Sequence, residues 1–175
     1  MCAFIRSVKM ANDLLIIGAG QFGIMVSEIA GETGLFDKID FLDDKNPLAI
    51  GKTDEYSRFV KSYPYAICAI GNPQIREKIT AGLIEAGYRV PNIISPHAYV
   101  SPSATLGYGV IVEPMAVIQK CAKIGNGVIV SSGAVVRHDG TVGDMCHLDC
   151  NSVVMSMSSV PSGTKVACLT QFKNE

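Results

Sequence analysis

From Ile94 onward, every sixth residue of the chain is aliphatic. The series runs unbroken through thirteen positions: Ile94, Val100, Leu106, Val112, Ile118, Ile124, Val130, Val136, Val142, Leu148, Val154, Val160 and Val166. From Val100 onward, the residue two places before each of these is small, from Ala98 to Thr164. Since alternate side chains of a strand point to the same side, a large and a small residue together fill the interior behind each flat face. This period of six predicts a parallel β-helix with a hexapeptide repeat.

A longer period lies on top of the hexads. Glycine follows the aliphatic residue at positions 107, 125 and 143, which are eighteen residues apart. Three hexads per turn give a triangular prism, whose coils stack at the inter-strand spacing of about 4.8 Å. The repeat therefore predicts a prism about four coils long, with corners two and three residues after each aliphatic position.

The first half of the chain follows a different pattern, in which buried strands alternate with amphipathic helices. We expect strands at 14–18, 38–44 and 65–71, helices at 21–33 and 72–87, and a fourth strand or an exit segment at 88–94. This order predicts a small parallel sheet covered by helices. Residues 1–91 carry 21 charged side chains and residues 92–170 only 8. The change in composition predicts a Rossmann-like α/β domain over 12–91 and a β-helix domain over 92–170.

Composition excludes several classes of protein. A net charge of −1 gives no basic surface for nucleic acid or an anionic membrane, and no apolar stretch approaches the roughly 20 residues of a spanning helix. None of the six cysteines forms a Cys-x-x-Cys pair, and their spacing suggests neither a disulfide framework nor a metal site. We expect a cytoplasmic protein with reduced thiols and no metal.

A glycine-rich turn carries the first candidate site. Gly18-x-Gly20-x-x-Gly23 lies between a predicted strand and a predicted helix, where bare glycines and free helix N–H groups suit a phosphate. About 20 residues later the second strand closes on Asp43-Asp44, placed to meet a ribose or a base. The alternative is a tight turn without a ligand. Because about 80 residues make only half of a dinucleotide fold, we favour a nucleotide-sugar over NAD.

Two histidines carry the second candidate site. His138 and Asp139 fall at a corner of the predicted prism, where an imidazole beside a carboxylate suits general-base catalysis; the alternative is a solvated corner residue. His147 points outward from the middle of a face, half a coil away from His138. Within one chain the two cannot share a pocket, whereas prisms lying side by side can bring them together. A plain surface histidine remains the alternative for His147.

The combination resembles the bacterial sugar acetyltransferases of the sialic-acid O-acetyltransferase family, which includes N-acetyltransferases of UDP-4-amino-sugars. The resemblance covers about residues 12–150 and rests on "IIGAGQFG", "FLDD", "AIGNPQIREKI", "SPHAYVSPSATLGYGV" and "VVRHDGTVGDMCHLD". It implies a left-handed β-helix and a homotrimer with its sites between protomers. It also implies roles for residues in both domains. In the first domain, the loop of Gly20, Gln21 and Phe22 contacts the nucleotide-sugar, Asp43 and Asp44 contact its uridine end, and Gly71 lies nearby. In the second domain, His138 is the general base and Asp139 supports it. His147 belongs to the acetyl-CoA site.

The resemblance therefore implies transfer of an acetyl group from acetyl-CoA to the amine of a UDP-linked amino sugar. Two alternatives remain: O-acetylation of a sialic acid or another sugar hydroxyl, and a non-enzymatic nucleotide-sugar-binding trimer that has lost its CoA site. The second rests on the expectation that relatives continue through further coils after His147. The sequence also departs from the family at Phe22, where relatives often have histidine.

Overall fold

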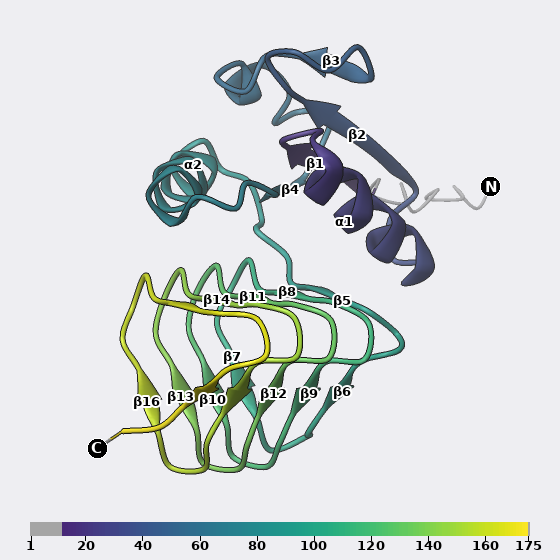
Figure 1. Cartoon of the computed structure of the whole chain (residues 1–175). Helices are drawn as coiled ribbons and strands as arrows, with labels where there is room; N and C mark the ends of the chain where they lie inside the picture. Colours follow the sequence, from purple (N-terminus) through teal and green to yellow (C-terminus); the bar gives the residue numbers. More distant parts are fainter. Residues whose placement is uncertain (1–11, 175) are drawn as a thin grey trace, which may run out of the picture.

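The computed structural model describes residues 12–174 and contains two domains (Figure 1). The first is a parallel four-stranded sheet in the order β3-β2-β1-β4. Its elements are β1 (Asp13–Ile17), α1 (Gln21–Glu32), β2 (Lys38–Leu42), β3 (Ala49–Gly51), the 3-10 helix η1 (Tyr56–Arg58), β4 (Tyr65–Cys68) and α2 (Pro73–Glu85). The order reverses direction at β1, because the chain proceeds outward through β2 and β3 and then returns to pair β4 on the other side of β1. Open parallel sheets bind ligands at such a switch point.

The two helices cover opposite faces of this sheet. Val26 and Ile29 of α1 pack with Leu14 and Ile16 on one face. Leu83 of α2 packs on the other face, in the cluster that contains Leu15 and Ile17. The alternation along β1 explains this arrangement, since successive side chains of a strand point to opposite faces and here those of residues 14–17 are all buried.

Expectation and structure differ at the edges of the strands. The second and third strands end at Leu42 and Cys68, so Asp43, Asp44 and Gly71 lie in the loops that follow them. The short edge strand β3 was not expected. Of the two expectations for 88–94, the exit segment is confirmed and the fourth strand is wrong, because Arg89 makes only an isolated bridge to Tyr65 and Ile93–Ile94 already forms the first rung of the prism.

The second domain is the predicted prism, built from three parallel sheets of two-residue strands. The first sheet contains β5 (Ile93–Ile94), β8 (Ile111–Val112), β11 (Ile129–Val130), β14 (His147–Leu148) and β17 (Lys165–Val166). The second contains β6 (Tyr99–Val100), β9 (Val117–Ile118), β12 (Val135–Val136), β15 (Val153–Val154) and β18 (Gln171–Phe172). The third contains β7 (Thr105–Leu106), β10 (Lys123–Ile124), β13 (Thr141–Val142) and β16 (Ser159–Val160). We call them the first, second and third prism faces. Partners within a face are eighteen residues apart, as the glycine spacing predicts.

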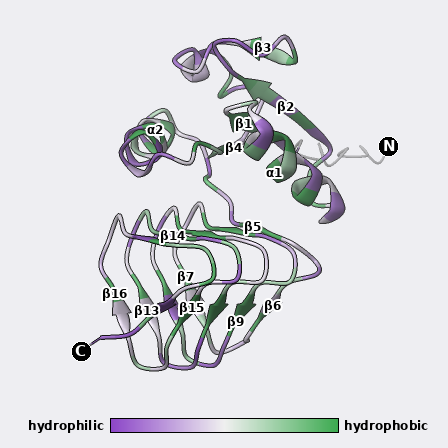
Figure 2. Ribbon diagram, viewed as in Figure 1, coloured by the Kyte–Doolittle hydropathy of each residue, from purple (hydrophilic) through white to green (hydrophobic). Residues whose placement is uncertain are grey.

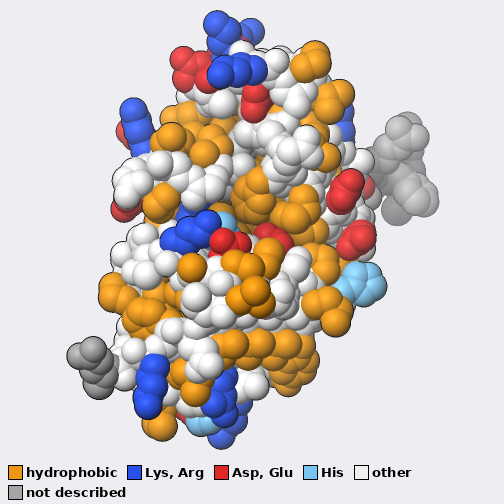
Figure 3. Space-filling model, in the orientation of Figure 1, with side chains coloured by type: hydrophobic (Ala, Val, Ile, Leu, Met, Phe, Trp, Pro, Cys, Tyr) orange, Lys and Arg blue, Asp and Glu red, His pale blue; other side chains and the backbone are white. Residues whose placement is uncertain are grey.

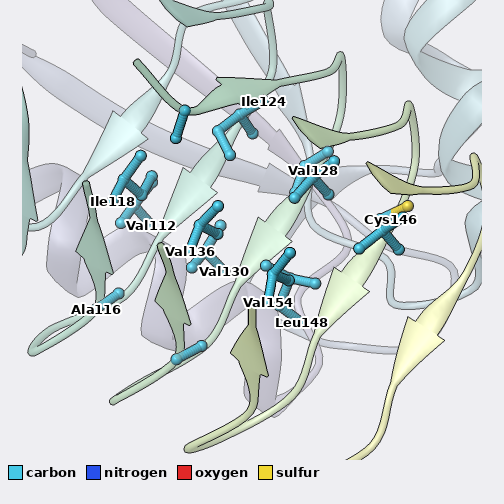
Figure 4. Close-up of a cluster of buried hydrophobic side chains, with 14 of the residues drawn as sticks. Val112, Ala116, Ile118, Ile124, Val128, Val130, Val136, Cys146, Leu148 and Val154 are labelled. Carbon is cyan, nitrogen blue, oxygen red and sulfur yellow. The ribbon is translucent and has the colours of Figure 1, made fainter. Parts of the chain in front are cut away.

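The aliphatic hexad positions fill the interior of the prism. Figure 4 shows Ile118, Val136 and Val154 stacked from coil to coil with the small Ala116 near a corner. Figure 2 shows the same hydrophobic character along the strands of both domains. From Leu106 to Val166, the corners use a left-handed residue three places after each hexad position, including Cys121, Asp139 and Met157, whose φ angles are 56°, 59° and 59°.

The first domain packs on the outer side of the first prism face. Ile93 and Ile111 point out of the prism, and both are buried in the same cluster as Val26 and Ile29 of α1. Ile129, one coil further along, is buried as well. The prism begins at Ile93, and a domain boundary at residues 91 and 92 remains our proposal.

Candidate functional site

The glycine-rich turn connects β1 to α1, at the point where the strand order reverses. Gly18 has a φ of +106°, which favours glycine, and a Cβ atom on Gly23 would lie 1.9 Å from the Gly18 carbonyl oxygen. These two glycines are therefore required by the close approach of helix and strand. Gly20 is the exposed N-cap of α1, and nothing lies within 4 Å of a Cβ built on it. Gln21 is exposed beside it, while Phe22 packs partly into the core.

Asp43 holds the turn from the neighbouring strand. Its carboxylate accepts hydrogen bonds from the backbone N–H groups of Ala19 at 2.8 Å, Lys45 at 2.8 Å and Asn46 at 2.9 Å. These N–H groups, with Ala19 first, lower the pKa of the Asp43 carboxyl below its ordinary value. The structure thus gives Asp43 a definite local task, which is to fix the shape of the turn.

Asp44 is more exposed than Asp43 and is bonded to the segment before η1. It accepts hydrogen bonds from the backbone N–H and the hydroxyl of Thr53, at 3.1 and 2.9 Å. Thr53 also lines a cavity of about 280 Å³ together with Tyr56, Ile75 and Lys78. This cavity adjoins the first turns of α2, which begin after Gly71 and the capping residue Asn72. The sheet thus brings the glycine-rich turn, the two aspartates and Gly71 to its carboxyl edge, as expected.

His138 and Asp139 lie at a corner between the second and third prism faces. His138 Nδ1 and Asp139 Oδ2 are 2.9 Å apart, and both side chains are about half exposed. In the tautomer with the proton on Nδ1, the carboxylate accepts from that N–H and Nε2 is the free nitrogen of the ring. The side-chain carbonyl of Gln119, from the preceding coil, accepts the His138 backbone N–H at 3.0 Å. The corner thus presents an oriented imidazole to its surroundings.

His147 begins β14 on the first prism face, in the outward row of Ile111 and Ile129. Its Nε2 lies 3.1 Å from the hydroxyl of Ser131, and desolvation lowers the pKa of the imidazole below its ordinary value. The expectation that this face is exposed holds only in part, because the first domain covers the earlier coils. On the face drawn in Figure 3, side chains of both charges and an imidazole lie between the two domains.

Within one chain the two histidines remain apart. His138 follows β12 on the second face, whereas His147 begins β14 on the first, with all of β13 between them. Each is therefore a candidate for a separate half of a site, as the half-coil spacing predicts.

Sequence reasoning missed Arg76, which is 1% exposed and projects from the first turns of α2. Its guanidinium donates to five backbone carbonyls: Gly127 at 2.8 Å, Ile70 at 3.0 Å, Gly71 at 2.8 Å, Met145 at 2.7 Å and Cys146 at 3.5 Å. Burial lowers the pKa of this group. Arg76 lies in the stretch "AIGNPQIREKI", but that stretch gave it no role, because its partners are main-chain atoms, which leave no pattern in a sequence.

Residues 12–174 contain neither a cluster of metal-binding side chains nor a membrane-spanning helix. No group of three or more histidine, cysteine, aspartate or glutamate side chains in this part of the chain is arranged to hold a metal ion. No helix there is long and apolar enough to cross a membrane.

An α/β domain with a switch-point turn, followed by a hexapeptide prism with a corner histidine, defines a class of two-domain sugar acyltransferases. Residues 13–83 match the family model of the PglD N-terminal domain. The chain is 28% identical to the acetyltransferase domain of PglB from Neisseria gonorrhoeae in complex with acetyl coenzyme A, over 93% of this chain and 94% of that one, with a TM-score of 0.77. A second structure of the same domain gives 29% identity, coverage of 90% and 92%, and a TM-score of 0.73.

The fold extends to a further relative. A variant of perosamine N-acetyltransferase from Caulobacter crescentus, in complex with CoA and GDP-perosamine, has a TM-score of 0.73 at 24% identity, over 91% of this chain and 90% of that one. The predicted fold, an α/β domain followed by a left-handed β-helix, is confirmed, and this chain is a homologue of sugar N-acetyltransferases. Since 94% of the PglB domain is covered, the expectation that relatives extend through several further coils is wrong for this one.

Proposed function

We propose that this protein transfers the acetyl group of acetyl-CoA to the amine of a nucleotide-linked amino sugar, with UDP as the nucleotide. The observation that carries the proposal is the contact of 2.9 Å between His138 Nδ1 and Asp139 Oδ2 at an open corner. It orients a neutral imidazole with Nε2 free to accept a proton. The relatives crystallised with acetyl-CoA or with CoA and a nucleotide-sugar support both co-substrates.

The reaction uses His138 as the base. The sugar nitrogen attacks the thioester carbonyl carbon, His138 Nε2 takes the proton from that nitrogen, and the C–S bond breaks to release the CoA thiolate. The proton then passes from the imidazolium to the thiolate. Asp139 supports the imidazolium while it carries the proton. No step calls for a metal.

The nucleotide end of the substrate belongs at the carboxyl edge of the first sheet. Gly20 leaves open space at the N-terminus of α1, where helix N–H groups suit a phosphate. Gln21 and Phe22 flank that position, and Gly71 faces it across the switch point. Asp44 is connected to the 280 Å³ cavity through its bonds to Thr53, which lines the cavity together with Asp54. For Asp43, which is occupied by three backbone donors, we propose a supporting role for the uridine site.

A homotrimer completes the site by using the second prism face. Its outward row is apolar over four coils, at Tyr99, Val117, Val135 and Val153, and only the last position, Gln171, is polar. The corresponding row of the third face is polar, with Thr105, Lys123, Thr141 and Ser159. His138 and Asp139 lie at the corner that borders this face beside Val135, so a second copy against this face covers their edge. His147 of that copy then supplies the acetyl-CoA side of the pocket.

The catalytic role is tested by assaying acetyl transfer to UDP-linked amino sugars, GDP-linked amino sugars and sialic acid. We expect a UDP-amino-sugar to be the best acceptor and His138→Ala to lower kcat by roughly 10²–10⁴-fold. His97→Ala, at a corner of the first coil, is the matched control and keeps wild-type activity. Equal rates for His138→Ala and wild type would remove His138 from the role. Transfer to a hydroxyl alone would favour O-acetylation, and calorimetry without acetyl-CoA binding would favour the scaffold.

The trimer is tested by charge substitutions on two faces. Val135→Lys puts an ammonium group on the apolar row, and Thr141→Lys puts the same group on the polar row. We expect sedimentation to give a trimer for wild type and for Thr141→Lys, but a monomer with little activity for Val135→Lys. A monomeric wild-type protein that is fully active would refute the shared site.

A further inference from the structure

Arg76 joins the loop proposed for the nucleotide-sugar to the strand that begins with His147. One terminal nitrogen of its guanidinium donates to the carbonyls of Ile70 and Gly71, in the loop between β4 and α2. The other donates to the carbonyls of Met145 and Cys146, immediately before His147. The two ends of this bridge come from different domains.

The bridge is specific to an arginine. Its five N–H groups are all used, and the side chain is 1% exposed without a carboxylate partner among residues 12–174. Burying a positive charge without a carboxylate partner costs free energy unless polar groups replace the water that solvated it. Here the carbonyl groups of two prism corners hydrogen-bond to the guanidinium in place of water. The Nε–H donates to the carbonyl of Gly127, which lies at the equivalent corner eighteen residues before Met145. Arg76 therefore also fixes the spacing between two successive coils.

The corners leave these carbonyls available for the guanidinium. The N–H groups of Gly127 and Met145 donate to the preceding coil, at the carbonyls of Tyr108 and Asn126. Both residues are left-handed, with φ angles of 61° and 57°. Neighbouring Gly163 and Asp144 line a small cavity of about 170 Å³ with Pro73 and Glu77 of α2, so the contact between the helix and these corners is confined to a few groups.

We infer that Arg76 is a positioning residue, which sets the distance between the nucleotide-sugar site of the first domain and the acetyl-transfer site on the prism. The inference rests on the proposed function. When the nucleotide is bound at the Gly71 loop, Arg76 fixes the distance from the attached sugar to the acetyl-transfer site on the prism. A misplacement of 1 Å can cost about a hundredfold in rate even where the substrate remains bound.

The test compares Arg76→Ala and Arg76→Lys with Arg89→Ala, which removes an exposed arginine from the first domain. We expect UDP and CoA each to bind Arg76→Ala within about threefold of wild type, while kcat falls about a hundredfold. Arg76→Lys should fall in between, because one ammonium group cannot reach both the loop and the corners. Partial recovery of kcat for Arg76→Ala with millimolar ethylguanidinium is expected as well. A purely structural role would instead reduce the folded fraction and both affinities together, with an unchanged kcat per folded site.

A second readout does not depend on activity. Hydrogen exchange at 145–148 should slow when UDP binds to wild type and to Arg89→Ala, but not when it binds to Arg76→Ala. If wild type acetylates no acceptor, the proposed function fails, and the exchange experiment still decides whether Arg76 links the loop to the corner. If UDP leaves 145–148 unchanged in wild type, or if Arg76→Ala keeps the wild-type kcat, the inference is overturned.

Discussion

Replacing Gly23 with alanine separates the fold-building part of the glycine-rich turn from its ligand-binding part. A Cβ atom at Gly23 would lie 1.9 Å from the carbonyl oxygen of Gly18 and 2.8 Å from the carbonyl carbon. Gly20 provides the matched control three residues earlier. Its φ is −69°, which any residue adopts, and the space around its Cβ position is open.

The size of the effect follows from this contact. Cβ atoms essentially never approach closer than 3.0 Å, so α1 must move from the turn by about 1.1 Å (3.0 − 1.9). Both clashing atoms are backbone, and Gly18 is buried with a φ of +106°, so no side chain can rotate away. Overpacking of this kind costs about 1–3 kcal/mol and occasionally more. We expect Gly23→Ala to lower the free energy of unfolding by about 3 kcal/mol.

Urea unfolding followed by circular dichroism measures this loss, and calorimetry with a UDP-sugar measures binding. Gly20→Ala should cost less than about 1 kcal/mol, the difference expected at a helix N-cap, but should weaken nucleotide-sugar binding. The Gly23→Ala variant should lose nucleotide-sugar binding only in proportion to its loss of folded protein. The reasoning is refuted if Gly23→Ala is as stable as wild type, or if Gly20→Ala destabilises the protein as much as Gly23→Ala does.

Three further predictions concern the prism. Leu148→Ala should cost about 2–5 kcal/mol of unfolding free energy in a denaturant titration, because this side chain is fully buried inside a coil. Desolvation lowers the pKa of His147 in the folded state, so the unfolded chain binds the proton more tightly. The free energy of unfolding should therefore fall as the pH drops below about 6.5 towards the pKa of the folded state. Unfolding experiments at several pH values should show that His147→Gln removes this part of the loss. Asp139→Asn should lower kcat at least tenfold with little change in melting temperature, because an amide can donate to Nδ1 and so favour the tautomer in which Nε2 carries the proton; an unchanged kcat would contradict the role of Asp139.

The prism was predictable in detail because its physics repeats. The interior has the same shape in each coil, so an aliphatic residue recurs every six positions with a small residue two places before it. The series is too long to arise by chance. The corner positions followed from the same count, and Asp139 does adopt the left-handed conformation that a corner requires. The glycine-rich turn was predictable for a related reason, since the clash at Gly23 leaves no other residue type.

Other features left weaker signals. The edge strand β3 has three residues and no alternation of its own. Arg76 makes all its bonds to main-chain carbonyls, so neither its burial nor its partners appear in the sequence. The packing of the first domain did leave a trace, because Ile93, Ile111 and Ile129 are eighteen residues apart and point outward. A row of isoleucines on the outside of a prism predicts that another element covers it.

That last observation explains how a uniform repeat builds an asymmetric molecule. The inward positions are alike on all three faces, so they specify only the prism. The outward positions differ from face to face: isoleucine in the first three coils of the first face, mainly valine on the second, and threonine, lysine and serine on the third. The isoleucines of the first face are buried, with the chain's own domain packed on that face, and the row of the third face suits water. The apolar second face is therefore the one available to another copy, and it borders the corner that carries His138.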